Sequence, residues 1–220
     1  MSKLYGAQQR ALQDRFDTRR IADKIEALAI QPQMSEMDIA FIHSRDMFWL
    51  SSIDEQGRPT VSYKGGNPGF VKAVDDKTLA FPLYDGNGMF YSAGNINASR
   101  KIGMLFMDFE RPNRLRVQGE ATISDKDPLM SSFTEALMVV RVNVTEVWPN
   151  CPRYVHRMQK VQTSRYVPQL KAKTPLAGWK RIDMLQEDLP AKDQGRAPKE
   201  GGLISIEEWF GKVASGDPEA

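Results

Sequence analysis

The feature that most constrains the fold is a series of short apolar segments, separated by turn residues, that runs from Met47 to Val147. The gaps between the segments hold Asp, Asn, Gly and Pro, which favour tight turns. Segments of this length and spacing are typical of antiparallel strands. We expect strands at 47–53, 60–64, 70–74, 78–83, 102–109, 115–124 and 138–147. Six or seven such strands favour a small closed barrel, because closure removes exposed sheet edges.

Helical patterns flank the predicted strands. Apolar residues recur at three- to five-residue steps over 11–30, which predicts one amphipathic helix. Ser35 and Asp38 have capping-box spacing, so a second helix should begin after Met34 and end before Asp46. Further helices are expected near 89–97, after Asp127–Pro128, at 152–161 and at 206–213.

These elements predict a mainly β fold with flanking helices, in three regions that form a single structural domain overall. The regions are an N-terminal helical cap at 1–46, a barrel with its flanking helices at 47–161, and a C-terminal arm with a short helix at 162–220. The arm is expected to be irregular, because 163–202 is rich in proline and shows no clear period. A chain of 220 residues buries roughly 70% of its unfolded surface, so its stability requires no metal or disulfide.

Charge and cysteine content exclude several classes of protein. The chain has 30 basic and 28 acidic residues and a net charge of +2, which gives no reason to expect a nucleic-acid partner. Cys151 is the single cysteine, so the chain has no internal disulfide and no cysteine-rich zinc site, and we expect no metal. No apolar run approaches the ~20 residues of a membrane span, and 1–17 lacks the apolar core of a secretory signal. We therefore expect a cytoplasmic protein with no membrane partner.

A first candidate binding site lies on the strand predicted at 60–64. Side chains alternate between the faces of a strand, so Thr60, Ser62 and Lys64 share one face. Two hydroxyls and an ammonium suit a phosphate, which needs several donors and a cation. The alternative is an ordinary solvent-facing side of a strand. The glycine-rich stretch 65–69 leads into a strand and reads as a plain turn.

A second candidate is the loop that contains Gly86 and Asn87. It leads toward the predicted helix that carries Ser92 and Asn95. Unpaired backbone N–H groups and the helix dipole attract anions at such a helix N-terminus. The alternative is a glycine-rich connection in which Asn87 serves as an N-cap.

A third candidate is the pair Arg114 and Arg116, which point to one face of a strand. On a cleft wall their guanidinium groups could hold a phosphate or the carbonyl edge of a heterocycle, and on an open face they would be solvated charges. His43 and His156 lie in predicted helices without the context of a catalytic triad. No paired carboxylates form an acid–base motif, so hydrolysis has little support.

Several of these motifs, taken in their order, resemble the pyridoxamine 5'-phosphate oxidase-like family of FMN-binding split barrels. The resemblance covers roughly 34–156, and 150–154 is also similar to a recurrent segment of one uncharacterised branch. The motifs are Phe48-Trp49-Leu50-Ser51-Ser52-Ile53-Asp54, Gly57-Arg58-Pro59, Val61-Ser62, Lys64-Gly65-Gly66, Pro68-Gly69-Phe70-Val71 and Leu115-Arg116-Val117-Gln118-Gly119. The resemblance implies a six- to seven-stranded antiparallel split β-barrel, a homodimer, and FMN in a cleft near the subunit interface.

The resemblance also implies where the cofactor binds. The family's FMN-contacting strand falls on 60–64, its phosphate loop on Gly86 and Asn87 with the following helix, and a later strand contact on the two arginines. The implied cofactor-binding residues are Thr60, Val61, Ser62, Lys64, Gly86, Asn87, Ser92, Asn95, Arg114 and Arg116.

This chain departs from the family pattern at two points. Pyridoxamine phosphate oxidases carry an Arg-Lys pair directly after the loop glycine, where this chain has Gly88-Met89-Phe90, and an arginine in the strand, where it has Thr60 or Ser62. We therefore expect FMN to bind, but do not expect pyridoxamine phosphate as the substrate. Near the C-terminus, Trp179 to Arg181 is comparable to the tryptophan and arginine with which family oxidases close their sites.

The leading hypothesis is an FMN-dependent oxidoreductase that transfers hydride or electrons between a reduced donor and a small-molecule substrate. Its catalytic residues are not identified by the sequence. The alternative is a non-catalytic protein that binds or carries flavin, deazaflavin F420 or haem, with His43 or His156 as the candidate haem ligand.

Overall fold

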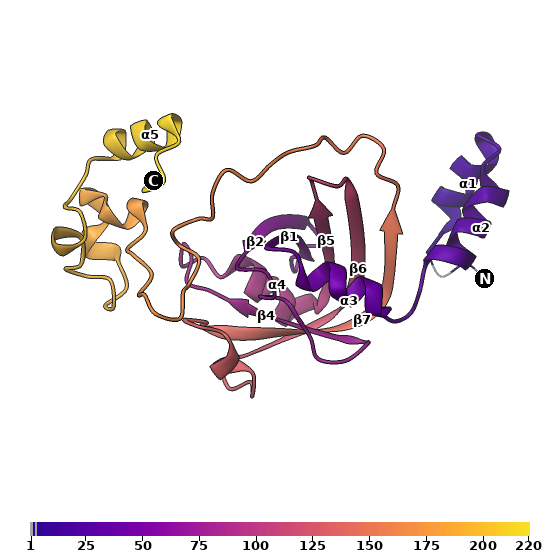
Figure 1. The fold of residues 1–220 in the computed structure, drawn as a ribbon, viewed down its shortest axis with the longest axis horizontal. Coiled ribbons are helices and arrows are strands. Elements are labelled where there is room, and N and C mark those ends of the chain that lie inside the picture. Colours follow the sequence, from indigo (N-terminus) through magenta and orange to yellow (C-terminus); the bar gives the residue numbers. More distant parts are fainter. Residues whose placement is uncertain (1, 3) are drawn as a thin grey trace. The chain divides into compact units, whose positions relative to one another are not determined.

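A computed structural model describes residues 2 and 4–220, and in it seven strands form one antiparallel sheet (Figure 1). The strands are β1 Met47–Ile53, β2 Pro59–Gly65, β3 Lys72–Ala73, β4 Thr78–Leu83, β5 Lys101–Asp108, β6 Asn113–Ser124 and β7 Met138–Asn150. Their order in the sheet is β2-β1-β5-β6-β7-β4-β3. All seven lie where the sequence predicts them, although β3 keeps only two residues.

The sheet is curled but not closed, so the expectation of a closed barrel is wrong and that of a split barrel is confirmed. β2 and β3 are the two ends of the strand order and do not pair with each other. The chain between β4 and β5, which includes helix α4 (Tyr91–Ser99), reaches the edge strand β2 instead. There Ser62 Oγ and Ser92 Oγ are 3.0 Å apart. Side-chain contacts therefore replace strand pairing at this edge.

The core lies on the concave face of the sheet, because each long strand points alternate apolar side chains inward. Phe48, Phe81 and Phe106 are fully buried, and the ring centroids of Phe81 and Phe106 lie 5.0 and 5.2 Å from that of Phe48. On the outward face the side chains are half-buried or exposed, including Trp49, Leu105 and Arg116. The inward face of the sheet is therefore buried and apolar, whereas the outward face is partly exposed.

A β-bulge interrupts the pairing of β6 with β7. Gln118 pairs with Glu146 and Gly119 with Val144, so Thr145 has no opposite residue. A Cβ atom on Gly119 would lie 2.4 Å from the carbonyl oxygen of Asn143. Only glycine allows the two backbones to approach this closely.

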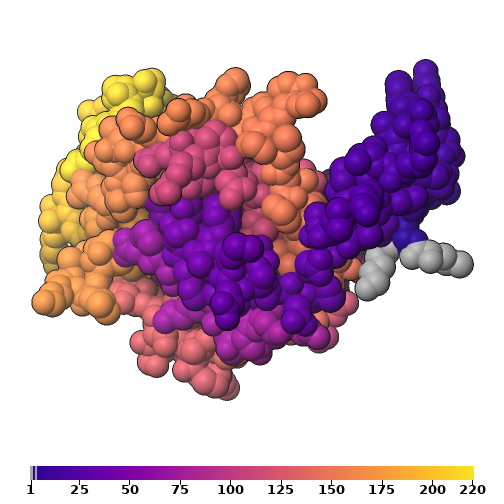
Figure 2. Space-filling view, turned by 45° about the vertical axis from the view of Figure 1, so that its right-hand side comes forward, coloured from indigo at the N-terminus to yellow at the C-terminus, as the bar shows by residue number. Residues whose placement is uncertain are grey.

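The N-terminal region forms a helical hairpin, not the single helix expected over 11–30. Helix α1 is Ala7–Arg15 and α2 is Arg19–Ala29, and Asp17 between them has a left-handed φ of 50° that reverses the chain. Arg10 holds the helices together through an ion pair of 2.6 Å with Asp23. Figure 2 shows the indigo surface of this hairpin, none of whose helical residues is buried.

Helix α3 (Glu36–His43) confirms the prediction from the capping box. The Ser35 hydroxyl accepts a hydrogen bond from the Asp38 amide at 3.2 Å, and the Asp38 carboxylate accepts one from the Ser35 amide at 2.9 Å. The helix expected at 152–161 is wrong. Its residues form a turn followed by irregular chain, because Tyr154 adopts a left-handed φ of 68°. After Asp127–Pro128 the structure has only a short 3₁₀ turn at Met130–Ser132.

The structure divides into two compact units, of which the first ends at Gln159 and the second is Lys160–Ala220. The second unit is built from three 3₁₀ segments and helix α5 (Ile206–Ser215), which confirms the helix expected at 206–213. The 3₁₀ segments are Gly178–Arg181, Asp183–Asp188 and Ala197–Lys199. Lys180 Nζ and Asp193 Oδ2 form a buried ion pair of 2.7 Å in this unit. The predicted division into a cap, a barrel and an arm within one domain stays a prediction.

The described residues contain neither a membrane-spanning helix nor a cluster of metal ligands. None of their helices has both the length and the apolar character needed to cross a bilayer. None of their His, Cys, Asp and Glu side chains gather in a group of three that could hold a metal ion.

Candidate functional site

A pocket of about 320 Å³ lies between the edge strand β2 and the loop that leads from β4 into α4. It brings together seven of the ten predicted cofactor-binding residues. These are Thr60, Val61, Ser62, Lys64, Gly86, Asn87 and Ser92. Because no residue of β1 lines the pocket, it lies along the edge of β2 that has no partner strand.

Side chains alternate between the two faces of β2, so its polar side chains lie on one face. Thr60, Ser62 and Lys64 are half-buried, whereas Val61 and Tyr63 are 65% and 63% exposed. The alternation therefore presents two hydroxyls and one ammonium group to the same half-buried environment. It is the arrangement expected from the sequence of this strand.

Lys64 is a half-buried cation with no ion-pair partner among the described residues. Burial lowers the pKa of its ammonium group, because removal of water disfavours the charged form. A bound anion would restore the lost stabilisation of the charge. Lys64 is thus better suited to hold a ligand than to support the fold.

The N-terminus of α4 supplies backbone donors on the opposite side of the pocket. Phe90 precedes the helix in a left-handed conformation, with φ of 49°, and its carbonyl accepts from the Gly94 amide at 2.8 Å. In a helix the first N–H groups have no intrahelical acceptor, so those of Tyr91, Ser92 and Ala93 are available. All three residues line the pocket. Together with the helix dipole, these donors favour an anion.

A hydrogen bond to Asp54 holds the first turn of α4 against the sheet. Asp54, at the end of β1, accepts from Tyr91 Oη at 3.2 Å and from Arg58 Nε at 2.7 Å. Burial opposes ionisation of Asp54, but hydrogen bonds from Arg58 and Gln56 outweigh it and lower the pKa of the carboxyl group. The first turn of α4 is therefore tied to an ionised side chain.

Asn95 does not line the pocket, although the sequence places it among the binding residues. It is a buried residue of α4 and donates from Nδ2 to Ser52 Oγ of β1 at 3.1 Å. Its amide holds the helix on β1. The sequence alone does not distinguish an asparagine that binds a ligand from one that attaches a helix to the sheet.

Tyr84, Met89 and Phe90 line the pocket but are not among the predicted binding residues, and the last two form its lip. Tyr84 is half-buried, and burial raises the pKa of its phenol. Met89 and Phe90 are 68% and 51% exposed, so apolar groups stand where the family pattern has an Arg-Lys pair. The sequence signal that could have identified these two residues is their position directly after Gly88.

Arg114 and Arg116 lie on the outward face of the sheet and do not line the pocket of Lys64. Arg116 lines a separate hollow of about 420 Å³, together with Trp49 and Trp148. Arg114 Nε is buried and has no hydrogen-bond partner among the described residues. The two arginines therefore lie outside the pocket of Lys64, although Val61 lines both this pocket and the hollow of Arg116.

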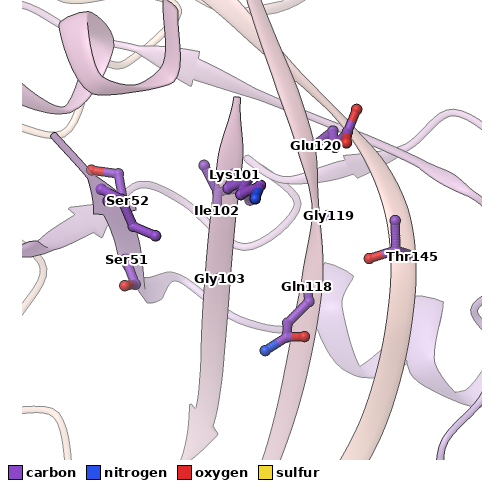
Figure 3. Close-up of a pocket in the computed structure, with 10 residues that line it drawn as sticks. Ser51, Ser52, Lys101, Ile102, Gly103, Gln118, Gly119, Glu120 and Thr145 are labelled. Atoms are coloured by element: carbon purple, nitrogen blue, oxygen red, sulfur yellow. The ribbon is translucent and has the colours of Figure 1, made fainter. Parts of the chain in front are cut away.

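A further hollow of about 410 Å³ adjoins the bulge on the same outward face. Figure 3 shows the polar side chains from β1, β5, β6 and β7 that line it, and Gly103 on β5, which has no side chain. These polar residues are Ser51, Ser52, Lys101, Gln118, Glu120 and Thr145. This hollow shares Ser51, Gly103 and Gln118 with the hollow of Arg116, so the two are continuous.

The two histidines lie outside the pocket. His43 Nε2 accepts a hydrogen bond from the Ala73 amide at 3.1 Å, which occupies that ring nitrogen. His156 is exposed in the irregular chain after β7, as is Cys151.

Comparisons with solved structures find similar chains at low identity. The chain is similar to HupZ of Group A Streptococcus, with 18% identity, coverage of 57% of this chain and 99% of that chain, and a TM-score of 0.44. It is similar to an FMN-binding protein from Syntrophomonas wolfei, with 11% identity, 64% and 97% coverage and a TM-score of 0.39. A third is HutZ, the heme storage protein from Vibrio cholerae, with 16% identity, 50% and 90% coverage and a TM-score of 0.38. All three TM-scores are below 0.5, so the ligands of these proteins are not evidence for this chain.

A comparison with protein families gives a firmer result. A search of the curated proteins gave no significant match. The family model of pyridoxamine 5'-phosphate oxidase, however, matches residues 34–152, which confirms the resemblance carried by the sequence motifs. Because this segment makes up more than half of the chain and contains all seven strands, the chain belongs to the pyridoxamine 5'-phosphate oxidase family.

Proposed function

We propose that the chain binds FMN, with the phosphate in the pocket of Lys64, and that it acts as an oxidoreductase on a small molecule. The observation that carries the proposal is Lys64 itself, a half-buried ammonium group that has no counter-ion among the described residues and lines the same pocket as two hydroxyls and a helix N-terminus. An FMN phosphate carries about two negative charges near neutral pH. Lys64 and the positive end of α4 would offset much of that charge.

The remaining donors would fix the orientation of the phosphate. Ser62 and Ser92 are already within hydrogen-bonding distance of each other, at 3.0 Å. Hydroxyl groups both donate and accept, so each can turn toward a phosphate oxygen. Thr60 adds a third hydroxyl on the same strand face. The site thus relies on several neutral donors and one cation.

Pyridoxamine phosphate is not the substrate in this proposal. That substrate brings a second phosphate, which needs cations of its own. The lip of the pocket carries the exposed apolar side chains of Met89 and Phe90 in place of the family's Arg-Lys pair. A less charged small molecule fits this lip better.

When bound, FMN would supply the redox chemistry, while the protein would hold the ring, orient it and set its electrostatic environment. Lys64, Ser62 and the α4 amides would anchor the phosphate end. Arg116 lines a neighbouring hollow that shares Val61 with this pocket, so we expect it at the ring end of the flavin and not at the phosphate. We also propose that the protein is a homodimer, with the cofactor near the subunit interface.

The outward face of the sheet supports such a homodimer. Val61 and Tyr63 are largely exposed there, next to the half-buried side chains of Trp49 and Leu105. An apolar face of this kind is typical of a surface that another chain covers. We also propose that the protein is cytoplasmic, since its free thiol, Cys151, is exposed.

A titration with FMN and with riboflavin, which lacks the phosphate, tests the proposal. Lys64→Met should weaken FMN binding roughly tenfold to hundredfold, the worth of a hydrogen bond to a charged group, and leave riboflavin binding unchanged. Lys126→Met, at an exposed lysine in the loop after β6, is the matched control and should bind both as the unaltered chain does. Light scattering of the same samples should give twice the mass of the chain.

Two outcomes would contradict the proposal. FMN affinity that Lys64→Met leaves unchanged would remove the phosphate from this pocket, and a Soret band in the purified protein would assign it to haem. The enzymatic role has its own readout. Reduction of the bound flavin by NADH or NADPH, with reoxidation by a substrate or oxygen, is expected of an oxidoreductase and not of a carrier.

A further inference from the structure

The N-terminal hairpin, made by α1 and α2, leaves its large apolar side chains exposed. Each is at least half exposed, and they are Leu12, Phe16, Ile21, Ile25 and Leu28. None of the residues of either helix is buried. Isolated helices of 9 and 11 residues are marginal in water, because tertiary packing supplies most of the stability of a helix. Another surface should therefore cover these side chains.

Polar groups, and not the apolar ones, hold the two helices together. Arg10 Nη1 lies 2.6 Å from Asp23 Oδ1, and Arg10 Nη2 lies 3.9 Å from Glu26 Oε2. Near the turn between the helices, Arg19 pairs with Asp14. The helices therefore meet along a polar seam, and their apolar side chains are left to contact something else.

The exposed apolar residues form a stripe on each helix. Ile21, Ile25 and Leu28 follow one another at steps of four and three residues, so they share one face of α2. Leu12 and Phe16, at the C-terminal end of α1, are also four residues apart. α2 is strongly amphipathic but has low overall hydrophobicity. This combination is typical of helices that lie in the plane of a membrane surface.

The charge left unpaired beside the stripes is positive. Arg15 and Lys24 are exposed and have no ion-pair partner in the described part of the chain. Each lies three residues after a member of a stripe, Leu12 or Ile21, and is therefore its neighbour on the helix surface. The acidic residues of the two helices are already paired within the hairpin, and they are Asp14, Asp23 and Glu26. An anionic surface is thus the charge complement of the stripes.

We propose that the hairpin lies on a membrane surface that contains anionic lipid, with its apolar stripes in the interface and Arg15 and Lys24 at the headgroups. A second hairpin carries the same unpaired cations, so it offers no complementary charge. The expectation of no membrane partner rests on the lack of a membrane span, which a helix lying on the surface does not need. The proposal is independent of the proposed function, and a cytoplasmic leaflet with anionic lipid suits it.

Sedimentation of the full chain with lipid vesicles tests the proposal. The chain should bind vesicles of phosphatidylcholine and phosphatidylglycerol in equal parts. It should bind vesicles of phosphatidylcholine alone roughly tenfold more weakly, because the attraction of two cations to the surface is lost. Raised salt should weaken binding to the anionic vesicles, since it screens exposed charges.

Two variants with matched controls locate the contact. Ile25→Glu should abolish vesicle binding, whereas Leu170→Glu, at a leucine that is also exposed, should bind as the unaltered chain does. Lys24→Gln should weaken binding to anionic vesicles roughly fivefold, and Lys126→Gln, at an exposed lysine after β6, should not. Lys64→Met should bind vesicles normally whatever its effect on FMN, so this proposal and the proposed function fail independently.

Three results would overturn the proposal. Equal binding to the two kinds of vesicle would remove the role of the cations, and undiminished binding by Ile25→Glu would place the contact outside the hairpin. Failure of the unaltered chain to bind anionic vesicles would exclude the membrane as the partner. If light scattering then gave a lower mass for Ile25→Glu, the stripes would belong to an interface with a second copy of the chain.

Discussion

At the scale of single residues, the candidate site depends on a carboxylate that does not touch the proposed ligand. Asp54 is 7% exposed and accepts hydrogen bonds from two backbone amides, the Arg58 guanidinium and the Tyr91 hydroxyl. Tyr91 belongs to the first turn of α4, whose amides line the pocket. Ionised Asp54 therefore holds in place the end of that helix that we propose to bind the phosphate.

The lowered pKa of Asp54 predicts how stability depends on pH. A carboxyl group whose folded pKa lies below its unfolded value of 3.8 stabilises the fold above that pH, and this stability is lost as pH falls through the folded pKa. Asp54→Asn should therefore reduce the free energy of unfolding at pH 7 and flatten its decline below about pH 4. Urea denaturation at both pH values measures this. The control Asp125→Asn, at an exposed position, should leave the pH dependence of the free energy of unfolding unchanged. If Asp54→Asn lowered this free energy by the same amount at every pH, ionisation of Asp54 would not be the source of the stability.

At the scale of elements, strands were more predictable than helices or tertiary placement. Short apolar runs between turn residues locate β1, β5 and β6, and the alternation of side chains locates the polar face of β2. The hairpin α1–α2 was predicted as one helix because the left-handed Asp17 leaves no periodic signature. The hydrophobic pattern of a strand also does not show which of its faces lies on the same side of the sheet as a distant loop. The resemblance placed Arg114 and Arg116 among the implied cofactor ligands, and neither lines the pocket of Lys64.

The bulge between β6 and β7 gives a prediction that compares two glycines in neighbouring strands. Gly119→Ala would place a methyl group 2.4 Å from the carbonyl oxygen of Asn143, so either backbone must shift. We expect a loss of about 1–3 kcal/mol in the free energy of unfolding, as for overpacked sites. Gly103→Ala in β5 is the control, since its new Cβ has no contact closer than 3.7 Å. Equal denaturation midpoints for the two variants would mean that the bulge tolerates a side chain.

At the scale of the whole molecule, the two units are stabilised by different interactions. The first unit has a continuous apolar core that includes Phe48, Phe81 and Phe106. The second has short 3₁₀ segments around a buried network in which Asp193 accepts from Lys180 at 2.7 Å and from Arg196 at 3.0 Å. A buried charge stabilises the fold only while all of its ion-pair and hydrogen-bond partners are present. The second unit should therefore be the more sensitive to loss of one polar side chain.

This difference predicts that substitutions in the two units act separately. Lys180→Met removes one partner of a buried carboxylate and should destabilise the second unit by about 3 kcal/mol, the lower end for a broken buried pair, because Arg196 remains. Phe48→Ala should destabilise the first unit by about 3–5 kcal/mol. Hydrogen exchange read by mass spectrometry on the full chain distinguishes them. Amides after 160 should lose protection in Lys180→Met while those of β1, β5 and β6 keep it, and Phe48→Ala should give the reverse. Loss of protection in both units from either substitution would mean that they unfold together, and the second unit would then share the stability of the barrel.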